Sequence, residues 1–87
     1  MKKTIEMYSA KWCGPCKQMK ALLSNTDTTG YDVKYIDIET PEGTLLAEQM
    51  VVKNVPTFIL YENKAIVARQ VGSSTWKELT NKFPKDE

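Results

Sequence analysis

The 87-residue chain is predicted to be an α/β protein in the order β-α-β-α-β-β-α, with a four-stranded mixed sheet and helices on both faces. Three observations predict this class. Runs rich in β-branched and aromatic residues alternate with segments of helical periodicity, and turn-forming residues separate them. The hydrophobic content of 41% is that of an ordinary globular protein. At this length we expect residues 1–87 to form a single domain.

The first strand is predicted over residues 3–9, because apolar and polar side chains alternate there, with Met7 on one face and Glu6 on the other. A helix is expected over residues 14–24, with Cys16, Met19 and Leu23 on its core-facing stripe. Turn residues fill positions 24–30, and the second strand is expected over 32–38. A strand, a helix and a second strand predict a right-handed parallel unit.

The second helix is expected to begin with Thr40 as N-cap and Pro41 in its first turn, and to reach about Met50. Residues 57–61 and 65–71 read as two strands of an antiparallel hairpin, joined by the short turn 62–64. The last helix is predicted over 75–83, where Thr75 and Glu78 have capping-box spacing. Residues 84–87 are expected to fray.

Composition excludes several functions. The net charge is +1, with no basic or acidic block, which argues against a role at nucleic acids or membrane surfaces. No apolar stretch resembles a signal peptide or a spanning helix, so we expect a reducing cytoplasm. The chain has no histidine, which excludes Cys-His and Ser-His mechanisms. Two cysteines supply only half of a Cys-rich zinc tetrahedron, so no metal site is expected.

The two cysteines lie in the segment Trp12-Cys13-Gly14-Pro15-Cys16, between the first strand and the first helix. A thiol at a helix N-terminus is acidified by free N–H groups and by the helix dipole, which makes Cys13 the expected nucleophile. Cys16, one turn further, should face the core and resolve the mixed disulfide. Gly14 allows close backbone approach, and Pro15 suits the start of a helix.

This segment resembles the active-site motif of the thioredoxin family, and Val55-Pro56-Thr57 supports the resemblance. The resemblance implies a thioredoxin-like fold and a protein disulfide reductase, with Cys13 and Cys16 as catalytic residues. It also implies that Pro56 is a cis-proline facing the dithiol and that Val55 offers its backbone to an extended substrate. Gly72 matches the glycine that lines the substrate groove. Together, the expected substrate-binding residues are Trp12, Gly14, Pro15, Val55, Pro56 and Gly72.

The chain also departs from the thioredoxin pattern. It has no room for the family's extra N-terminal strand and helix, so it resembles the short thioredoxins of phages and archaea. Tyr8-Ser9 looks like the pair that precedes the glutaredoxin motif. The buried aspartate that thioredoxins place six residues before the first cysteine is replaced by Met7. Glu6 should point to the opposite face of the strand.

The resemblance implies a dithiol with no bound cofactor, reduced by a thioredoxin reductase-like flavoenzyme or by glutathione. Expected partners are disulfide-containing proteins such as ribonucleotide reductase, and we expect a monomer. The potential should lie at roughly −270 to −200 mV, towards the reducing end. Three alternatives stay open: a glutathione-dependent glutaredoxin, a non-catalytic accessory binding module, and a metal carrier in which two chains pool four thiolates. Asp37 and Glu39 are expected to be solvated carboxylates.

Overall fold

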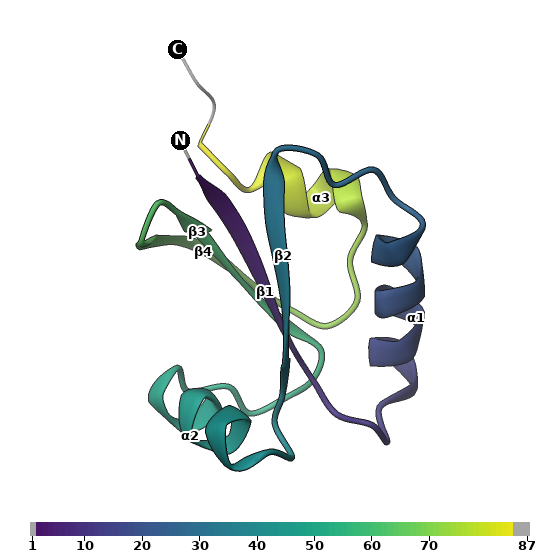
Figure 1. Ribbon diagram of the computed structural model, residues 1–87, viewed down its shortest axis with the longest axis vertical. Helices are drawn as coiled ribbons and strands as arrows, with labels where there is room; N and C mark the ends of the chain where they lie inside the picture. Colours follow the sequence, from purple (N-terminus) through teal and green to yellow (C-terminus); the bar gives the residue numbers. More distant parts are fainter. Residues whose placement is uncertain (1, 85–87) are drawn as a thin grey trace.

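The computed structural model describes residues 2–84 of the chain, and it confirms the predicted order of elements. The strands and helices alternate along the chain until the final hairpin and helix (Figure 1). Their bounds are β1 (Lys3–Ser9), α1 (Gly14–Ser24), β2 (Tyr31–Asp37), α2 (Pro41–Gln49), β3 (Thr57–Glu62), β4 (Ala65–Val71) and α3 (Trp76–Asn81).

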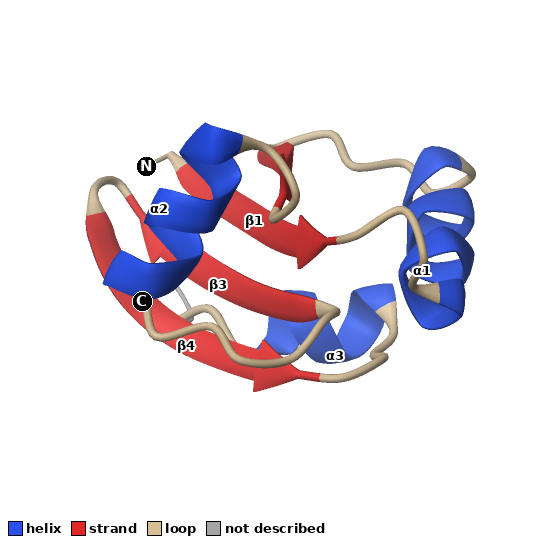
Figure 2. Cartoon of the chain, turned by 90° about the horizontal axis from the view of Figure 1, so that it is seen from below, coloured by secondary structure: helices blue, strands red, loops and turns tan. Residues whose placement is uncertain are grey.

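The four strands form one mixed sheet in the order β2-β1-β3-β4. β1 pairs in parallel with β2 and antiparallel with β3, and β4 is antiparallel to β3 with a register shift between Leu60 and Tyr61. Helices α1 and α3 cover one face, and α2 lies on the other (Figures 1 and 2). The predicted fold class, with helices on both faces of a four-stranded mixed sheet, is therefore confirmed.

The core consists of two clusters, one on each face of the sheet. On the face of α1 and α3, buried residues from the strands pack against the two cysteines and both helices; they include Ile5, Met7, Cys13, Cys16, Met19, Leu23, Phe58, Leu60 and Leu79. On the face of α2, Tyr8 and Ile59 pack against Ala47. The alternation predicted for β1 is confirmed, and both of its faces are buried near its carboxyl end.

The bounds of one strand and two helices differ slightly from their predicted positions. β2 begins one residue earlier than expected, and α2 ends at Gln49 with Met50 as its C-cap. α3 spans only residues 76–81, because the chain tightens at its end: the N–H of Phe83 donates to the carbonyl of Thr80 at 3.2 Å. This turn places the Phe83 side chain in the core. The end predicted to fray lies, apart from Pro84, outside the described residues.

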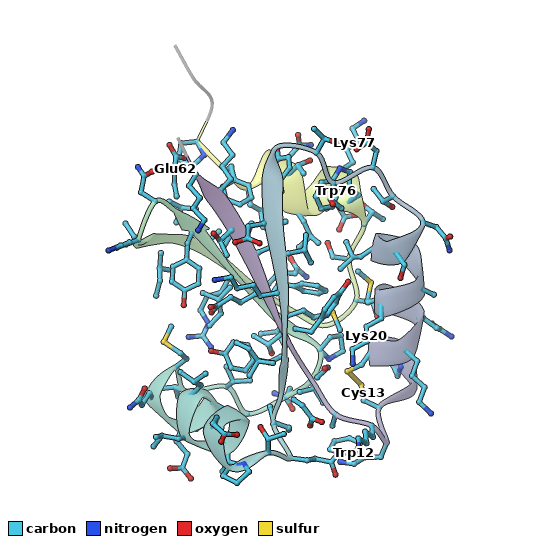
Figure 3. All side chains as sticks on the ribbon, in the orientation of Figure 1. Trp12, Cys13, Lys20, Glu62, Trp76 and Lys77 are labelled. Carbon is cyan, nitrogen blue, oxygen red and sulfur yellow. A yellow bond between two sulfur atoms is a disulfide. The ribbon has the colours of Figure 1, made fainter. Side chains whose placement is uncertain are left out.

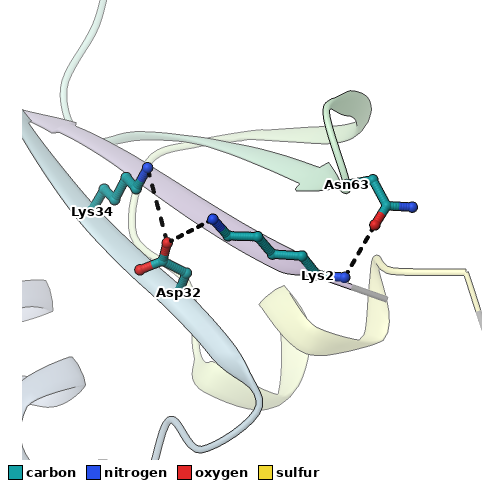
Figure 4. A network of polar contacts seen from close by, with 4 residues as sticks. All are labelled: Lys2, Asp32, Lys34 and Asn63. Carbon is teal, nitrogen blue, oxygen red and sulfur yellow. Dashed lines mark hydrogen bonds and ion pairs between the residues drawn. The ribbon is translucent and has the colours of Figure 1, made fainter.

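A small polar network closes the end of the sheet where β1 begins (Figure 4). Lys2 Nζ lies 3.6 Å from Asp32 Oδ2, and Lys34 Nζ lies 3.9 Å from the same oxygen. The backbone N–H of Lys2 donates to Asn63 Oδ1 at 3.2 Å, which joins the start of β1 to the β3–β4 turn. All three charged side chains are well exposed, so these ion pairs contribute little to stability.

Candidate active site

Cys13 and Cys16 form a disulfide at the beginning of α1, with their Cα atoms 5.2 Å apart (Figure 3). Cys13 is the N-cap of the helix, and its Sγ accepts a hydrogen bond from the N–H of Cys16 at 3.2 Å. Its own N–H donates to the carbonyl of Ala10 at 3.2 Å, which forms the turn between β1 and α1. Pro15 stands in the first turn, where its missing N–H breaks no hydrogen bond.

The geometry around the two sulfurs is asymmetric. Cys13 Sγ receives an N–H at the positive end of a helix dipole, and both influences favour its thiolate once the disulfide is reduced. Cys16 lies one turn further along, on the stripe that packs into the core, and only 1% of its surface is exposed. Cys13 is 4% exposed in the disulfide form. The predicted shielding of Cys16 is confirmed.

A hollow of about 270 Å³ lies beside the dithiol turn, lined by Trp12, Ile38, Val52, Lys53, Asn54 and Val55. It brings together Trp12 and Val55, which are far apart in the sequence. Trp12 lies at the same end of the molecule as Cys13 (Figure 3), and 68% of its surface is exposed. An exposed tryptophan beside a hollow lined by both apolar and polar side chains is typical of a docking surface. Sequence reasoning missed the other four lining residues, whose only signals were an apolar residue at a strand end and a connector before Pro56: Ile38, Val52, Lys53 and Asn54.

The other predicted groove residues, Gly14, Pro15, Pro56 and Gly72, do not line this hollow. The Val55–Pro56 peptide bond is cis, as the resemblance implied. The carbonyl of Pro56 accepts a hydrogen bond from the N–H of Gly72 at 2.8 Å, and Gly72 has a φ of +89°, which favours glycine. Gly14 and Pro15 are exposed on the first turn of α1, and no atom lies within 4 Å of where a Gly14 Cβ would stand. That space is open to an approaching chain.

Two hydrogen bonds fix the dithiol loop against the end of β2. The backbone N–H of Lys11 donates to Glu39 Oε1 at 2.9 Å, and the N–H of Ile38 donates to the carbonyl of Ser9 at 2.9 Å. Asp37 Oδ1 accepts from the N–H of Glu39 at 2.9 Å. The expectation of solvated carboxylates holds for Glu39, which is exposed, while Asp37 is half-buried; in addition, both accept backbone N–H groups of the loops that flank the hollow. Isolated strand-end carboxylates gave no sign of these contacts.

The position of the missing aspartate is apolar and dry. Met7 is 0% exposed and lies in the same cluster as both cysteines. Glu6 points to the other face, where it lines a separate hollow with Tyr61. Burial and the neighbouring Glu6 carboxylate together raise the pKa of Tyr61. Ser9, two residues beyond Met7, has a buried hydroxyl with no hydrogen-bond partner within the described residues.

Trp76, the first residue of α3, packs against the core rather than at the dithiol. Its ring meets Tyr31 edge-on at a centroid distance of 5.0 Å, at the end of the molecule opposite Cys13 (Figure 3). Within residues 2–84, no group of three His, Cys, Asp or Glu side chains could hold a metal ion. None of the described helices combines the length and the hydropathy that crossing a bilayer requires.

A disulfide-forming cysteine pair at a helix N-terminus, in a fold that also carries a cis Val55–Pro56 bond, indicates a thiol-disulfide oxidoreductase. The thioredoxin family model matches residues 2–85, and this chain belongs to the thioredoxin family. It is 35% identical to a thioredoxin of Chlamydia pneumoniae over 78 residues, which cover 90% of this chain and 76% of that protein. It is 34% identical over 70 residues to a thioredoxin of Ophiophagus hannah, covering 80% of this chain and 67% of that protein.

Solved structures agree with this assignment. The crystal structure of a Nicotiana alata thioredoxin superposes with a TM-score of 0.80 at 32% identity, covering 93% of this chain and 70% of that one. Thioredoxin f2 of Chlamydomonas reinhardtii gives 0.78 at 27% identity, covering 91% and 74%. Some relatives are much longer: the match spans 14% of a mouse thioredoxin domain-containing protein and 57% of mitochondrial thioredoxin-3 of Saccharomyces cerevisiae.

Proposed function

We propose that this protein reduces disulfide bonds of other proteins through a Cys13/Cys16 dithiol–disulfide cycle. The observation that carries the proposal is the N-cap position of Cys13, whose sulfur accepts the Cys16 N–H beside the hollow between Trp12 and Val55. That arrangement stabilises a thiolate where an extended substrate can reach it. Val55, next to Pro56, offers its backbone to such a substrate by β-augmentation, while Trp12 covers the apolar side chains that flank the disulfide.

The substrate-reducing half of the cycle balances between the dithiol and the substrate disulfide, and an external electron donor then returns the disulfide to the dithiol. The Cys13 thiolate attacks one substrate sulfur, a mixed disulfide forms, and the other substrate sulfur leaves as a thiolate that takes up a proton. The Cys16 thiolate then attacks Cys13 Sγ, the substrate's first sulfur leaves, and two electrons have passed to the substrate. The product is the Cys13–Cys16 disulfide seen in the structure.

The proton on Cys16 needs a route that avoids a buried carboxylate. Met7 cannot accept a proton, and Glu6 lies on the opposite face of β1. We propose that water or the departing substrate thiolate removes it. The test is Glu6→Gln, which should leave turnover and Cys13 alkylation unchanged. If Glu6→Gln abolishes turnover while Cys13 alkylation stays normal, Glu6 handles the proton and this route is wrong.

The dithiol is proposed to work without a bound cofactor and as a monomer. Electrons would come from a thioredoxin reductase-like flavoenzyme or from glutathione, and ribonucleotide reductase is one candidate among cytosolic disulfide substrates. A glutathione-dependent glutaredoxin is the second candidate, because the chain is short and Tyr8-Ser9 precedes the motif.

One experiment tests the proposed function and separates the two candidates. Insulin reduction is followed with thioredoxin reductase and NADPH as donor, and reduction of a mixed glutathione disulfide is followed with glutathione alone. The proposal predicts insulin reduction that disappears in a Cys13→Ser, Cys16→Ser variant. Strong activity with glutathione and none with the reductase would replace the thioredoxin-like assignment by the glutaredoxin one.

A further inference from the structure

Arg69, in the middle of the edge strand β4, reaches across the sheet to the end of α2. Its Nη1 donates to the carbonyl oxygen of Met50 at 2.7 Å, and its Nη2 donates to the carbonyl oxygen of Val51 at 3.2 Å. A single guanidinium thus binds two consecutive carbonyls of the turn that follows α2. The fork of donors on arginine suits this geometry, whereas a lysine ammonium offers only a point charge.

The turn has two reasons to need this support. Met50 is the C-cap of α2, so the carbonyls there have no helical partner and carry the negative end of the helix dipole. Val51 has a φ of +55°, a left-handed conformation that β-branched residues rarely adopt. The N–H groups of this turn are already bound, Val51 to Glu48 O at 3.2 Å and Val52 to Ala47 O at 2.8 Å. Arg69 binds the carbonyl side.

The supported turn leads directly into one wall of the groove. Residues 52–55 line the hollow opposite Trp12, and they end at the cis Val55–Pro56 bond. The far end of this wall is fixed by the Gly72 N–H bound to Pro56 O at 2.8 Å, and by Thr57 Oγ1, which donates to Asn54 O at 2.6 Å. The near end is fixed by Arg69, which does not itself line the hollow.

We propose that Arg69 is a positioning residue for the substrate groove: it sets the course of residues 52–55 from outside, without contacting the substrate or the dithiol. This inference rests on the proposed function and names a determinant of protein-substrate binding within it. Loss of Arg69 should release the near end of the wall and weaken docking of an extended chain. The electron chemistry of Cys13 and Cys16 lies on other elements, so it should not change.

The test compares Arg69→Ala and Arg69→Lys with the wild type and with Lys64→Ala, which removes one positive charge from the β3–β4 turn without touching residues 50–55. Insulin serves as the protein disulfide and 5,5′-dithiobis(2-nitrobenzoate) as a small disulfide, with the reductase and NADPH keeping the protein reduced. The dithiol–disulfide equilibrium with glutathione is measured in parallel.

Arg69→Ala should lower kcat/KM for insulin about tenfold, mainly through KM, because two charge-assisted hydrogen bonds are lost. Arg69→Lys should lose about threefold, since a lysine can bind one carbonyl at most. Reduction of the small disulfide and the glutathione equilibrium should stay within about twofold, as should every value for Lys64→Ala. Should Arg69→Ala fail to fold, Arg69→Lys carries the same comparison.

Two results would overturn the inference. One is insulin kinetics within twofold of wild type in the arginine variants. The other is an equal loss with both disulfides, which would place the effect on the dithiol or on the whole fold. A wild-type protein that reduces neither disulfide would instead contradict the proposed function, so the two failures are distinguishable.

Discussion

Gly43, in the first turn of α2, sits where the helix touches the end of β2, and replacing it with alanine should be costly. A Cβ at this position would overlap the carbonyl oxygen of Asp37 and lie 2.6 Å from its carbonyl carbon and 2.9 Å from Thr40 Oγ1. The obstacle is backbone, so no side-chain rotation relieves it. The N-terminal turn of α2 has to move away from β2, together with the Thr40 cap that receives the Gly43 N–H at 3.0 Å.

The expected loss follows from two opposing terms. Overpacking against backbone costs about 3 kcal/mol, while alanine is better than glycine in a helix by about 1 kcal/mol. The net loss for Gly43→Ala is about 2 kcal/mol, which for a domain of this size lowers the melting temperature by roughly 10 °C. Because Ile38, which lines the hollow, directly follows β2, KM for insulin should rise as well.

Urea unfolding of the oxidised protein measures the loss, with Gly14→Ala as the control for stability. No atom lies within 4 Å of a Cβ at Gly14, so that variant should be at least as stable as wild type. If Gly43→Ala unfolds within about 0.5 kcal/mol of wild type, α2 does not contact β2 as described and the reasoning fails.

Three further predictions concern buried groups. Ser9→Ala should raise the free energy of unfolding by about 1 kcal/mol, because it removes a buried hydroxyl that has no hydrogen-bond partner within the described residues. Thr57→Val removes a hydroxyl that is hydrogen-bonded, so it should lower the free energy of unfolding. Equal losses in the two variants would contradict this reasoning. Met7→Asp should destabilise by about 3 kcal/mol at pH 7 and less at pH 4, since its buried carboxyl favours the neutral form, while Met7→Leu should be nearly neutral. The raised pKa of Tyr61 means that its contribution to stability is complete below the unfolded pKa of 10.0 and is lost as pH rises above it. Tyr61→Phe should therefore flatten the alkaline arm of the stability profile, and an unchanged slope above pH 10 would exclude that role.

The elements that could be predicted are those whose signals are local. The bounds of β1 and α1 followed from strict alternation, from a cysteine at the N-cap and from a proline in the first helical turn. The end of α3 could not be predicted, because Phe83 leaves the helix to reach a core that only the folded sheet creates. The sequence pattern there continues the helical period.

The candidate site divides in the same way. The dithiol and the roles of its cysteines followed from residues adjacent in the chain, whereas Val55, Pro56 and Gly72 were placed only through the family resemblance. The contacts of Glu39 with Lys11 and of Arg69 with the turn after α2 join segments 28, 18 and 19 residues apart. A hydrogen bond between a charged side chain and a backbone group far away in the chain produces no periodicity or motif in the sequence from which it could be predicted. Gly43 did leave a sign, since glycine in a helical turn indicates a close approach.

The central claim is that Cys13 attacks the substrate and Cys16 resolves the mixed disulfide. A Cys16→Ser variant, reduced and mixed with a disulfide-containing protein such as insulin, should trap a stable mixed disulfide, and peptide mass spectrometry should find the substrate on Cys13. The matched Cys13→Ser variant should trap far less, because Cys16 lies one turn into the helix and lacks the N-cap position that favours the Cys13 thiolate. A substrate attached chiefly to Cys16 in the Cys13→Ser variant, with little on Cys13 in the other, would contradict the account.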